Sequence, residues 1–454
     1  LNRVIEKAFR GSAPAQINVP RDYWTQVIDI ELPPIVRFER QGGGKEAIEN
    51  AAKLLSKAKF PVILSGAGVV LGGAIDECKK LAEKLDAPVC NGYQHNDSFP
   101  GSHPLAVGPL GYNGSKAAME LISKADVVLA LGTRLNPFST LPGYGIDYWP
   151  KKATIIQVDM NPDRIGLTKK VSVGICGDSK QVAQQILDKL SSDAGNTGRE
   201  ERKNLIHKTK SAWLQTLSGL DHEEDDPGTV WNKEARERDK DRMSPRQAWR
   251  AIQDALPQDA IISSDIGNNC AIGNAYPTFE KPRKYLAPGL FGPCGYGFPA
   301  ILGAKIGCPD TPVVGFAGDG AFGISMNEMS SCAREEWPAI TMVIFRNYQW
   351  GAEKRNSILW FDDNFVGTEL DPELSYAKVA NACGLKGVTC KTMEETTKAI
   401  KQSCEDQKKG ITTFIEIILN QELGEPFRRD AMKKPVKVAG IKKEDMKKQP
   451  SLIS

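Results

Sequence analysis

The sequence is poor in the residues and runs that mark zinc-binding, secreted and membrane proteins. It contains four histidines, and its ten cysteines stand singly, without a Cys-x-x-Cys pair. Zinc sites are usually built from clusters of these two residue types, so we expect no zinc site. Runs of about 18 or more apolar residues are also lacking, so we expect no membrane-spanning helix and a cytoplasmic protein with reduced thiols.

An excess of charge of either sign is lacking as well. The 59 lysines and arginines nearly balance the 56 aspartates and glutamates, which leaves a net charge of +3. This balance gives no reason to expect a nucleic acid or a membrane surface as a partner. The chain is 41% hydrophobic and 25% charged, an ordinary composition for a globular protein, and its 454 residues are enough for about three domains.

Residues 313–349 are the most informative stretch and predict a strand–helix–strand unit. Val313–Ala317 and Thr341–Phe345 are apolar runs with the length of buried parallel strands. A helical pattern lies between them, and Ser325 and Glu328 have the spacing of a capping box at its start. Such a crossover places both strands in one parallel sheet, so we expect the residues that follow each strand at the same sheet edge.

The residues that follow these two strands predict a magnesium and phosphate site. Asp319 offers a carboxylate oxygen, Asn347 an amide oxygen and Gln349 a main-chain carbonyl, and Mg²⁺ prefers such oxygen ligands. Gly318 and Gly320 allow the backbone to approach a phosphate closely. Gly-Asp-Gly alone also forms ordinary turns, but its place between a strand and a helix, with Asn347 after the next strand, makes the signal specific.

This combination resembles the thiamine-diphosphate-binding motif of the acetolactate synthase and pyruvate decarboxylase superfamily, and the resemblance extends over essentially the whole chain. It implies an enzyme with thiamine diphosphate and Mg²⁺ as cofactors, in which the three oxygen donors named above bind the metal. It also implies that residues after the first strand lie beside the cofactor, namely Gly318, Gly320, Ala321 and Phe322.

The loop after the apolar run Ala260–Ser263 is implied by the resemblance to wrap the diphosphate. Backbone amides near Gly267 and Asn268 and the side chain of Asn269 are the candidate contacts. The alternative is a plain turn from a strand into a helix. The helix before this strand is expected to begin after Ser244, which acts as its N-cap.

A second glycine-rich loop, residues 292–300, is implied by the resemblance to hold the pyrimidine end of the cofactor. In related enzymes a carbonyl, here that of Gly292, accepts a hydrogen bond from the aminopyrimidine, and an apolar side chain two residues later wedges under the cofactor. That position is Cys294, which is smaller than the usual Met, Leu or Ile. Either Cys294 is the wedge or a neighbour such as Tyr296 shares its role.

The expected fold class is α/β, with two doubly wound parallel-sheet domains and the last helix and strand of a third. That last pair, with its strand ending at Pro20, resembles the end of a pyrimidine-binding domain, and the alternative is an N-terminal arm. The expected boundaries are 1–20 for the remnant of the pyrimidine-binding domain, 21–44 for a linker, 45–190 for a central α/β domain, 191–243 for a charged linker, 244–425 for a diphosphate-binding domain and 426–454 for a basic tail.

The central domain has a strong secondary-structure pattern and a weak ligand signal. Periodicity predicts helices at Glu46–Lys57 and Ile75–Leu85 and strands at 61–64, 87–90, 126–131 and 154–158. Glycines at positions 66, 68, 72 and 73 are compatible with a dinucleotide loop, but their spacing is not Gly-x-Gly-x-x-Gly. A bound nucleotide and a purely structural domain therefore both stay open.

The stretch after the metal residues is expected to select the substrate. Gly351 is followed by Ala-Glu-Lys-Arg-Asn, where acetolactate synthases carry apolar and aromatic residues. This stretch, together with Trp360–Leu370 and His95–Pro100, resembles the sulfoacetaldehyde acetyltransferases. Lys354 and Arg355 are the candidate contacts to two anionic substrates, sulfoacetaldehyde and phosphate, and the alternative is that they are surface cations in local salt bridges.

The resemblance implies conversion of sulfoacetaldehyde and phosphate to acetyl phosphate and sulfite, in the degradation of taurine and other sulfonates. The alternatives are an acetolactate synthase-like enzyme or 2-keto acid decarboxylase and, in another class, a non-catalytic α/β scaffold. In this superfamily a glutamate of the N-terminal domain activates the cofactor. We expect it upstream of Leu1, so that the chain is a fragment without activity of its own. We also expect a homodimer or homotetramer.

Overall fold

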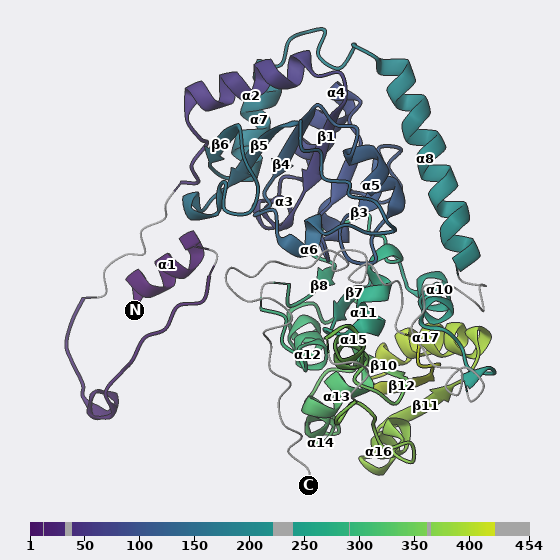
Figure 1. Ribbon diagram of the computed structural model, residues 1–454. Helices are drawn as coiled ribbons and strands as arrows, with labels where there is room; N and C mark the ends of the chain where they lie inside the picture. The colour runs from purple at the N-terminus through teal and green to yellow at the C-terminus, as the bar shows by residue number, and fades with distance from the viewer. Residues whose placement is uncertain (12, 32–38, 221–238, 290, 361–364, 423–454) are drawn as a thin grey trace, which may run out of the picture. The chain divides into compact units, whose positions relative to one another are not determined.

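The structure is a computed structural model that describes residues 1–11, 13–31, 39–220, 239–289, 291–360 and 365–422 (Figure 1). The chain forms two compact units. The first comprises Leu1–Val89, Ala125–Asn136 and Lys152–Lys203, and the second comprises Cys90–Lys124, Pro137–Lys151 and Asn204–Ser454. Among the described residues, no helix has the length and apolar character needed to cross a membrane.

A six-stranded sheet is the framework of the first half of the chain. Its strands are β1 (Pro61–Ser65), β2 (Val89–Asn91), β3 (Ala106–Pro109), β4 (Val127–Leu131), β5 (Thr154–Asp159) and β6 (Val173–Cys176). They lie in the order β3-β2-β1-β4-β5-β6, and β1, β4, β5 and β6 pair in parallel. This is the strand order of doubly wound dinucleotide-binding folds, which confirms the expected fold class.

The helices of this half are α2 (Lys45–Lys57), α3 (Ala67–Gly72), α4 (Ile75–Leu85), α5 (Lys116–Ile122), α6 (Pro137–Thr140), α7 (Ser179–Lys189) and α8 (Arg199–Leu220), with short turns η2 (Asn96–Ser98) and η3 (Pro162–Arg164). The two predicted helices are confirmed as α2 and α4. The four predicted strands are confirmed as β1, β2, β4 and β5, with ends that differ by at most two residues. Local apolar periodicity is enough to locate these elements.

The glycines after β1 are needed for packing. An added Cβ at Gly68 would lie 2.6 Å from the Cα of Gly132, and one at Gly66 would lie 2.6 Å from the Gly132 carbonyl oxygen. The amide of Gly68 also donates to that carbonyl at 2.8 Å. The loop after β1 therefore lies directly against the end of β4, which supports the structural interpretation of these glycines.

A second six-stranded sheet occupies the C-terminal half. Its strands are β7 (Ile261–Ser264), β8 (Tyr285–Leu286), β9 (Val313–Gly318), β10 (Thr341–Arg346), β11 (Lys386–Cys390) and β12 (Thr413–Ile418). They are all parallel, in the order β11-β12-β10-β9-β7-β8. The order reverses between β7 and β9, and open α/β sheets bind ligands at the carboxyl ends of strands at such a point.

The helices around this sheet are α10 (Pro245–Ala255), α11 (Asn268–Ile272), η4 (Gly273–Ala275), α12 (Gly297–Gly307), α13 (Asp319–Ser325), η5 (Met326–Glu328), α14 (Met329–Cys332), α15 (Gly351–Trp360), α16 (Tyr376–Ala382) and α17 (Met393–Gln407). Ser244 caps α10, and its side chain and that of Gln247 form a capping box. The predicted start of this helix is thus confirmed.

The predicted capping box at Ser325 and Glu328 is wrong. The helix after β9 begins at Asp319, immediately after the strand, and its regular hydrogen bonding gives way to a 3₁₀ turn after Ser325. Ser325 makes no capping hydrogen bond in its own segment, and its hydroxyl donates instead to the carbonyl of Gly295 at 3.0 Å. A contact to a loop 30 residues away thus replaces the predicted local one.

The N-terminal segment matches the expectation only in part. Helix α1 (Asn2–Gly11) is present, followed by η1 (Arg21–Thr25), but residues 13–20 form no strand. A strand needs a neighbour for its backbone hydrogen bonds, and no described strand pairs with this segment. Residues 32–38 and 221–238 of the two expected linkers, and the whole expected tail 426–454, lie outside the described residues. The domain boundaries stay predictions.

A fully buried arginine lies at the end of β10. The guanidinium of Arg346 forms ion pairs with Asp319 at 3.0 Å and with Glu416 at 3.7 Å. It also donates to the main-chain carbonyls of Asp371 and Leu374. Both carboxylates are buried as well, so this group of charges is stable only while every member keeps its partners.

We predict that Arg346→Met lowers the free energy of unfolding by about 3–5 kcal/mol, because it leaves two buried carboxylates without their cation. Urea unfolding of the protein without ligands measures this loss. Arg334→Met is the matched control: Arg334 pairs with Glu336 on the surface, and its loss is expected to cost about 0.5 kcal/mol or less. Equal effects of the two substitutions would contradict the prediction.

Candidate functional site

Asp319 and Asn347 lie at the carboxyl ends of two adjacent strands. β9 and β10 pair in parallel, with Gly318 opposite Phe345. Asp319 is one residue beyond this pair and Asn347 is two residues beyond it, so both lie at the same sheet edge. Both side chains are almost completely buried. The prediction that these two residues share one edge is confirmed, whereas their role as metal ligands stays a prediction.

The Asp319 carboxylate is held by several donors. Its Oδ2 accepts from the Arg346 guanidinium and from the amide of Tyr348 at 2.7 Å, and its Oδ1 accepts from the amide of Gly320 at 2.9 Å. Burial raises the pKa of Asp319 to about 6, and Arg346 opposes this rise. The group is therefore ionised at neutral pH. Three of its roughly four acceptor positions are taken, which leaves one for a metal.

Asn347 supplies the observation that fits a metal. Its Oδ1 is buried and has no hydrogen-bond partner in the described part of the chain, which is costly unless a cation or another donor satisfies it. Gln349 is also buried, and its Nε2 donates to the carbonyl of Gln421 at 3.1 Å. The carboxylate of Asp319, the amide oxygen of Asn347 and the carbonyl of Gln349 are hard oxygen donors, so the residues present fit Mg²⁺.

Asp265, which follows β7, fixes the glycine-rich loop. Its buried carboxylate accepts from the amides of Ile266 at 2.7 Å, Gly295 at 3.1 Å and Gly297 at 2.7 Å. Burial raises the pKa of Asp265, and these amides oppose the rise. The sequence analysis did not single out Asp265. Its place directly after a strand was the available signal.

The loop is held from a second direction by Ser325. The hydroxyl of Ser325 donates to the carbonyl of Gly295, whose amide is bound by Asp265. Gly295 has a φ of +87°, which side chains other than glycine rarely adopt. The amide and the carbonyl of Gly295 are therefore both hydrogen-bonded. Asp265, after β7, binds the amide, and Ser325, at the end of the helix after β9, binds the carbonyl. Gly292 and Cys294 are positioned in consequence.

The predicted diphosphate residues lie at the start of α11. Gly267 has a φ of +135° and open space at its Cα. Asn268 and Asn269 are buried, and the carbonyl of Asn269 accepts from the indole of Trp249 at 2.7 Å. The Oδ1 of Asn269 is buried and, within the described ranges, accepts no hydrogen bond, so this oxygen can accept one from a ligand.

The residues after β9 differ in what they can offer a cofactor. Gly318 has open space where a side chain would lie, but an added Cβ at Gly320 would lie 2.8 Å from the ring of Trp350. The side chains of Ala321 and Phe322 pack in the core. Gly320 is thus needed for the tryptophan, and Ala321 and Phe322 can offer a cofactor only their backbone groups.

The two predicted anion contacts have different surroundings. The ammonium of Lys354 pairs with Glu369 and donates to Gln421 at 3.3 Å, which matches the local salt-bridge alternative. Arg355 is buried and donates to the hydroxyl of Tyr112, 243 residues earlier in the chain. The sequence analysis missed Tyr112, because no local pattern marks a partner so distant in the sequence.

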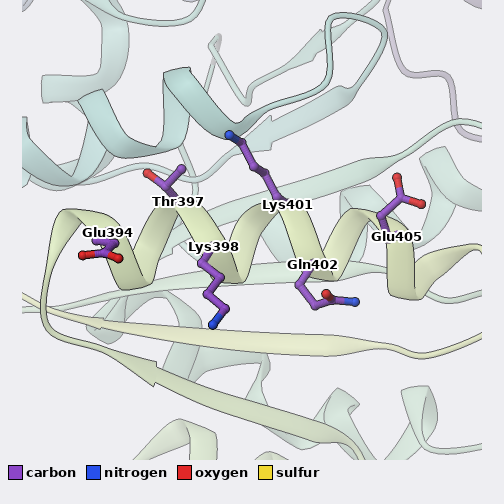
Figure 2. Close-up of a pocket in the computed structure, with 6 residues that line it drawn as sticks. All are labelled: Glu394, Thr397, Lys398, Lys401, Gln402 and Glu405. Atoms are coloured by element: carbon purple, nitrogen blue, oxygen red, sulfur yellow. The ribbon is translucent and has the colours of Figure 1, made fainter.

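A surface hollow along α17 shows no comparable chemistry (Figure 2). Its lining comes from one helix: Glu394, Thr397, Lys398, Lys401, Gln402 and Glu405. The side chains leave the helix in different directions and do not converge on a common point. We therefore place the candidate site at the carboxyl edge of the second sheet.

Comparisons with known proteins agree with this site. A family model described as "Thiamine pyrophosphate enzyme, central domain" matches residues 48–186, and one described as "Thiamine pyrophosphate enzyme, C-terminal TPP binding domain" matches residues 265–417. The chain is 78% identical to a "Probable sulfoacetaldehyde acetyltransferase" of Rhizobium meliloti (strain 1021), over 99% of this chain and 76% of the relative.

Two further relatives mark the range of similarity. The chain is 75% identical to a "Sulfoacetaldehyde acetyltransferase" of Roseovarius nubinhibens, over 99% of this chain and 74% of the relative. It is 29% identical to a "Probable acetolactate synthase large subunit" of Methanocaldococcus jannaschii, over 86% of this chain and 64% of the relative. The similarity to the first group is thus far higher than to the second.

We predict that Ser325→Ala weakens the binding of thiamine diphosphate about 5- to 10-fold, because one hydrogen bond that holds the glycine-rich loop is lost. Calorimetric titration in the presence of Mg²⁺ measures the dissociation constant. Ser330→Ala is the control, since the exposed hydroxyl of Ser330 bonds only the nearby carbonyl of Asn327 among the contacts described. An unchanged dissociation constant for Ser325→Ala would show that the hydrogen bond from Ser325 to Gly295 does not support cofactor binding.

We predict that Asn347→Leu weakens the affinity for Mg²⁺ at least about tenfold without lowering the stability of the protein. The substitution removes an oxygen that has no protein partner, and the leucine fills a similar volume, so the fold loses no hydrogen bond at this atom. Mg²⁺ titration in the presence of thiamine diphosphate and thermal unfolding without ligands measure the two effects. Unchanged metal affinity would remove Asn347 from the ligand set.

Proposed function

Because this chain belongs to the thiamine-diphosphate-dependent enzymes, on the branch of the sulfoacetaldehyde acetyltransferases, we propose that it serves the reaction of sulfoacetaldehyde with phosphate to give acetyl phosphate and sulfite. The identity of 78% over nearly the whole chain is the observation that carries this proposal. The sheet edge with Asp319 and Asn347 supports it, because a non-catalytic scaffold has no need of a buried, unpartnered metal donor.

The proposed reaction needs no external oxidant or reductant. The aldehyde carbon is oxidised to the acyl level, while the neighbouring carbon loses sulfite and is reduced to a methyl group. The aldehyde carbon loses its proton and the methyl carbon gains one, so these two balance. Phosphate accepts the acetyl group, and the proton of hydrogenphosphate leaves with sulfite as hydrogensulfite. When bound, thiamine diphosphate supplies the nucleophilic carbon and the electron sink that such carbanion chemistry requires.

The residues of this chain bind and orient the reactants. Asp319, Asn347 and the carbonyl of Gln349 would hold Mg²⁺, and the side chain of Asn269 is placed for the diphosphate. Asp265 and the loop it binds would fix the other end of the cofactor. Most of these side chains are almost completely buried, which helps to exclude water that would otherwise hydrolyse the acetyl group before phosphate accepts it.

Arg355 is the cation best placed for the anionic reactants, because it is buried and close to the start of α11. Sulfoacetaldehyde and phosphate are both anions, and a guanidinium can bind two of their oxygens at once. Lys354 is less suited, since its charge is paired with Glu369. We further propose that the working form is a homodimer or homotetramer in the cytoplasm.

The test uses the product of the complete reading frame with thiamine diphosphate, Mg²⁺ and sulfoacetaldehyde, with and without phosphate. We predict that sulfite and acetyl phosphate form in equal amounts and that acetyl phosphate depends on phosphate. Sulfite without acetyl phosphate would mean a different acceptor. Acetolactate from pyruvate, with neither product from sulfoacetaldehyde, would favour the acetolactate synthase-like alternative instead. Asn347→Leu serves as the control that shows whether formation of sulfite and acetyl phosphate depends on the metal.

A further inference from the structure

A buried polar cluster joins three segments of the second unit that are far apart in sequence. Arg355 of α15 donates to the hydroxyl of Tyr112, in the loop between β3 and α5, and this hydroxyl donates to Oδ1 of Asn268 at 3.1 Å. The guanidinium carbon of Arg355 lies 5.8 Å from the centre of the Tyr112 ring. Arg355 and Tyr112 are 4% and 8% exposed, so the guanidinium is held in a largely water-free place.

The loop that carries Tyr112 is fixed to the candidate cofactor segment. Asn274, which is fully buried in η4, donates from its side chain to the carbonyl of Tyr112 at 3.1 Å. Its side-chain oxygen accepts from the amide of Gln94 at 3.3 Å. One asparagine thus ties two loops to the segment that begins with Asn268. Such support preorganises a binding site, because the side chains need not move to meet a ligand.

Asn113, next to Tyr112, gives an independent sign of a ligand. Its side chain is buried, and neither Oδ1 nor Nδ2 has a hydrogen-bond partner among the residues that the structure describes. A buried amide in this state costs about 1–3 kcal/mol for each unsatisfied group. The residue also has a φ of +48°, which asparagine adopts more readily than most residues. The unsatisfied buried amide is therefore the feature that points to a ligand.

We propose that Arg355, Tyr112 and Asn113 form the site that binds a tetrahedral oxyanion group of the substrates, either the sulfonate of sulfoacetaldehyde or inorganic phosphate. This inference rests on the proposed function. The guanidinium fork matches two oxygens of such a group, and Nδ2 of Asn113 can donate a further hydrogen bond. The Tyr112 hydroxyl accepts from Arg355 and donates to Asn268, so it orients the guanidinium rather than binding the anion itself. The contact with Asn268 places the site beside the predicted diphosphate residues. Tyr112 and Asn113 become specificity-determining residues together with Arg355.

The test measures binding of two unreactive probes, isethionate for the sulfonate and inorganic phosphate for the acceptor, to the protein loaded with thiamine diphosphate and Mg²⁺. We expect Arg355→Met to weaken binding of at least one probe about tenfold or more by calorimetry. Asn113→Asp, which keeps the shape and adds a negative charge, is expected to weaken the same probe. The probe that is affected identifies the source of the oxyanion, and an effect on both means a shared site.

Two comparisons keep the result specific. Lys354→Met removes the neighbouring cation on α15 and is expected to change probe binding less than twofold, because Lys354 is paired with Glu369. In Arg355→Met we expect the dissociation constant of thiamine diphosphate and the unfolding temperature to stay unchanged. The KM for the affected substrate is then expected to rise while cofactor binding stays the same. A loss of cofactor affinity equal to the loss of probe affinity would overturn the proposal, as would absence of probe binding by the wild-type protein.

This experiment tests the oxyanion site and the proposed acetyltransferase reaction independently of each other. If the probes bind through Arg355 but no acetyl phosphate forms, the proposed function fails and the oxyanion site stands. If acetyl phosphate forms and Arg355→Met leaves the KM for both substrates unchanged, the site fails and the proposed function stands. Tyr112→Phe, which removes only the hydroxyl between Arg355 and Asn268, gives a second variant whose fold is least disturbed.

Discussion

The buried charge of Arg346 is the constraint on which the carboxyl edge of the second sheet, with Asp319 and Asn347, depends. A guanidinium in the core requires negative partners, and here they come from the strands on both sides: Asp319 follows β9 and Glu416 lies in β12. Glu416 also accepts from the hydroxyl of Ser375 and the amide of Tyr376. The three strands β12, β10 and β9 are therefore tied together at their ends. Protein contacts set the direction of the Asp319 carboxylate, so an ion bound as we propose would meet a prepared ligand.

The proposed substrate end of the site depends on contacts of another kind. Its parts come from the loop before α5, from α11 and from α15, and hydrogen bonds of a guanidinium, a phenol and two asparagine side chains connect them. Each part occupies its place only when the rest of the second unit has folded. If the proposed oxyanion site is correct, a few polar residues on these segments adapt the site to anionic substrates, while the second sheet carries the candidate cofactor residues.

The fold was largely predictable from sequence, whereas the contacts of the site were not. Apolar runs located β9 and β10, and the Gly-Asp-Gly and Asn347 positions followed from them, because strand ends and turns are local features. Ser325 was assigned a local role, although its partner lies in a separate loop. Tyr112 lies 243 residues from Arg355, and no local pattern marks it. The sequence left a nucleotide loop and a structural role open for Gly68, and its close packing on Gly132 supports the structural role.

The way Asp265 holds the glycine-rich loop has a consequence for how such sites diverge. The carboxylate binds main-chain amides at Gly295 and Gly297 and makes no demand on the side chains between them and Gly292. Position 294 can therefore change in size during evolution while the path of the backbone is kept. A small cysteine can stand there without loss of the loop's shape. Variation in side-chain size at position 294 is thus separated from the fixed path of the loop backbone.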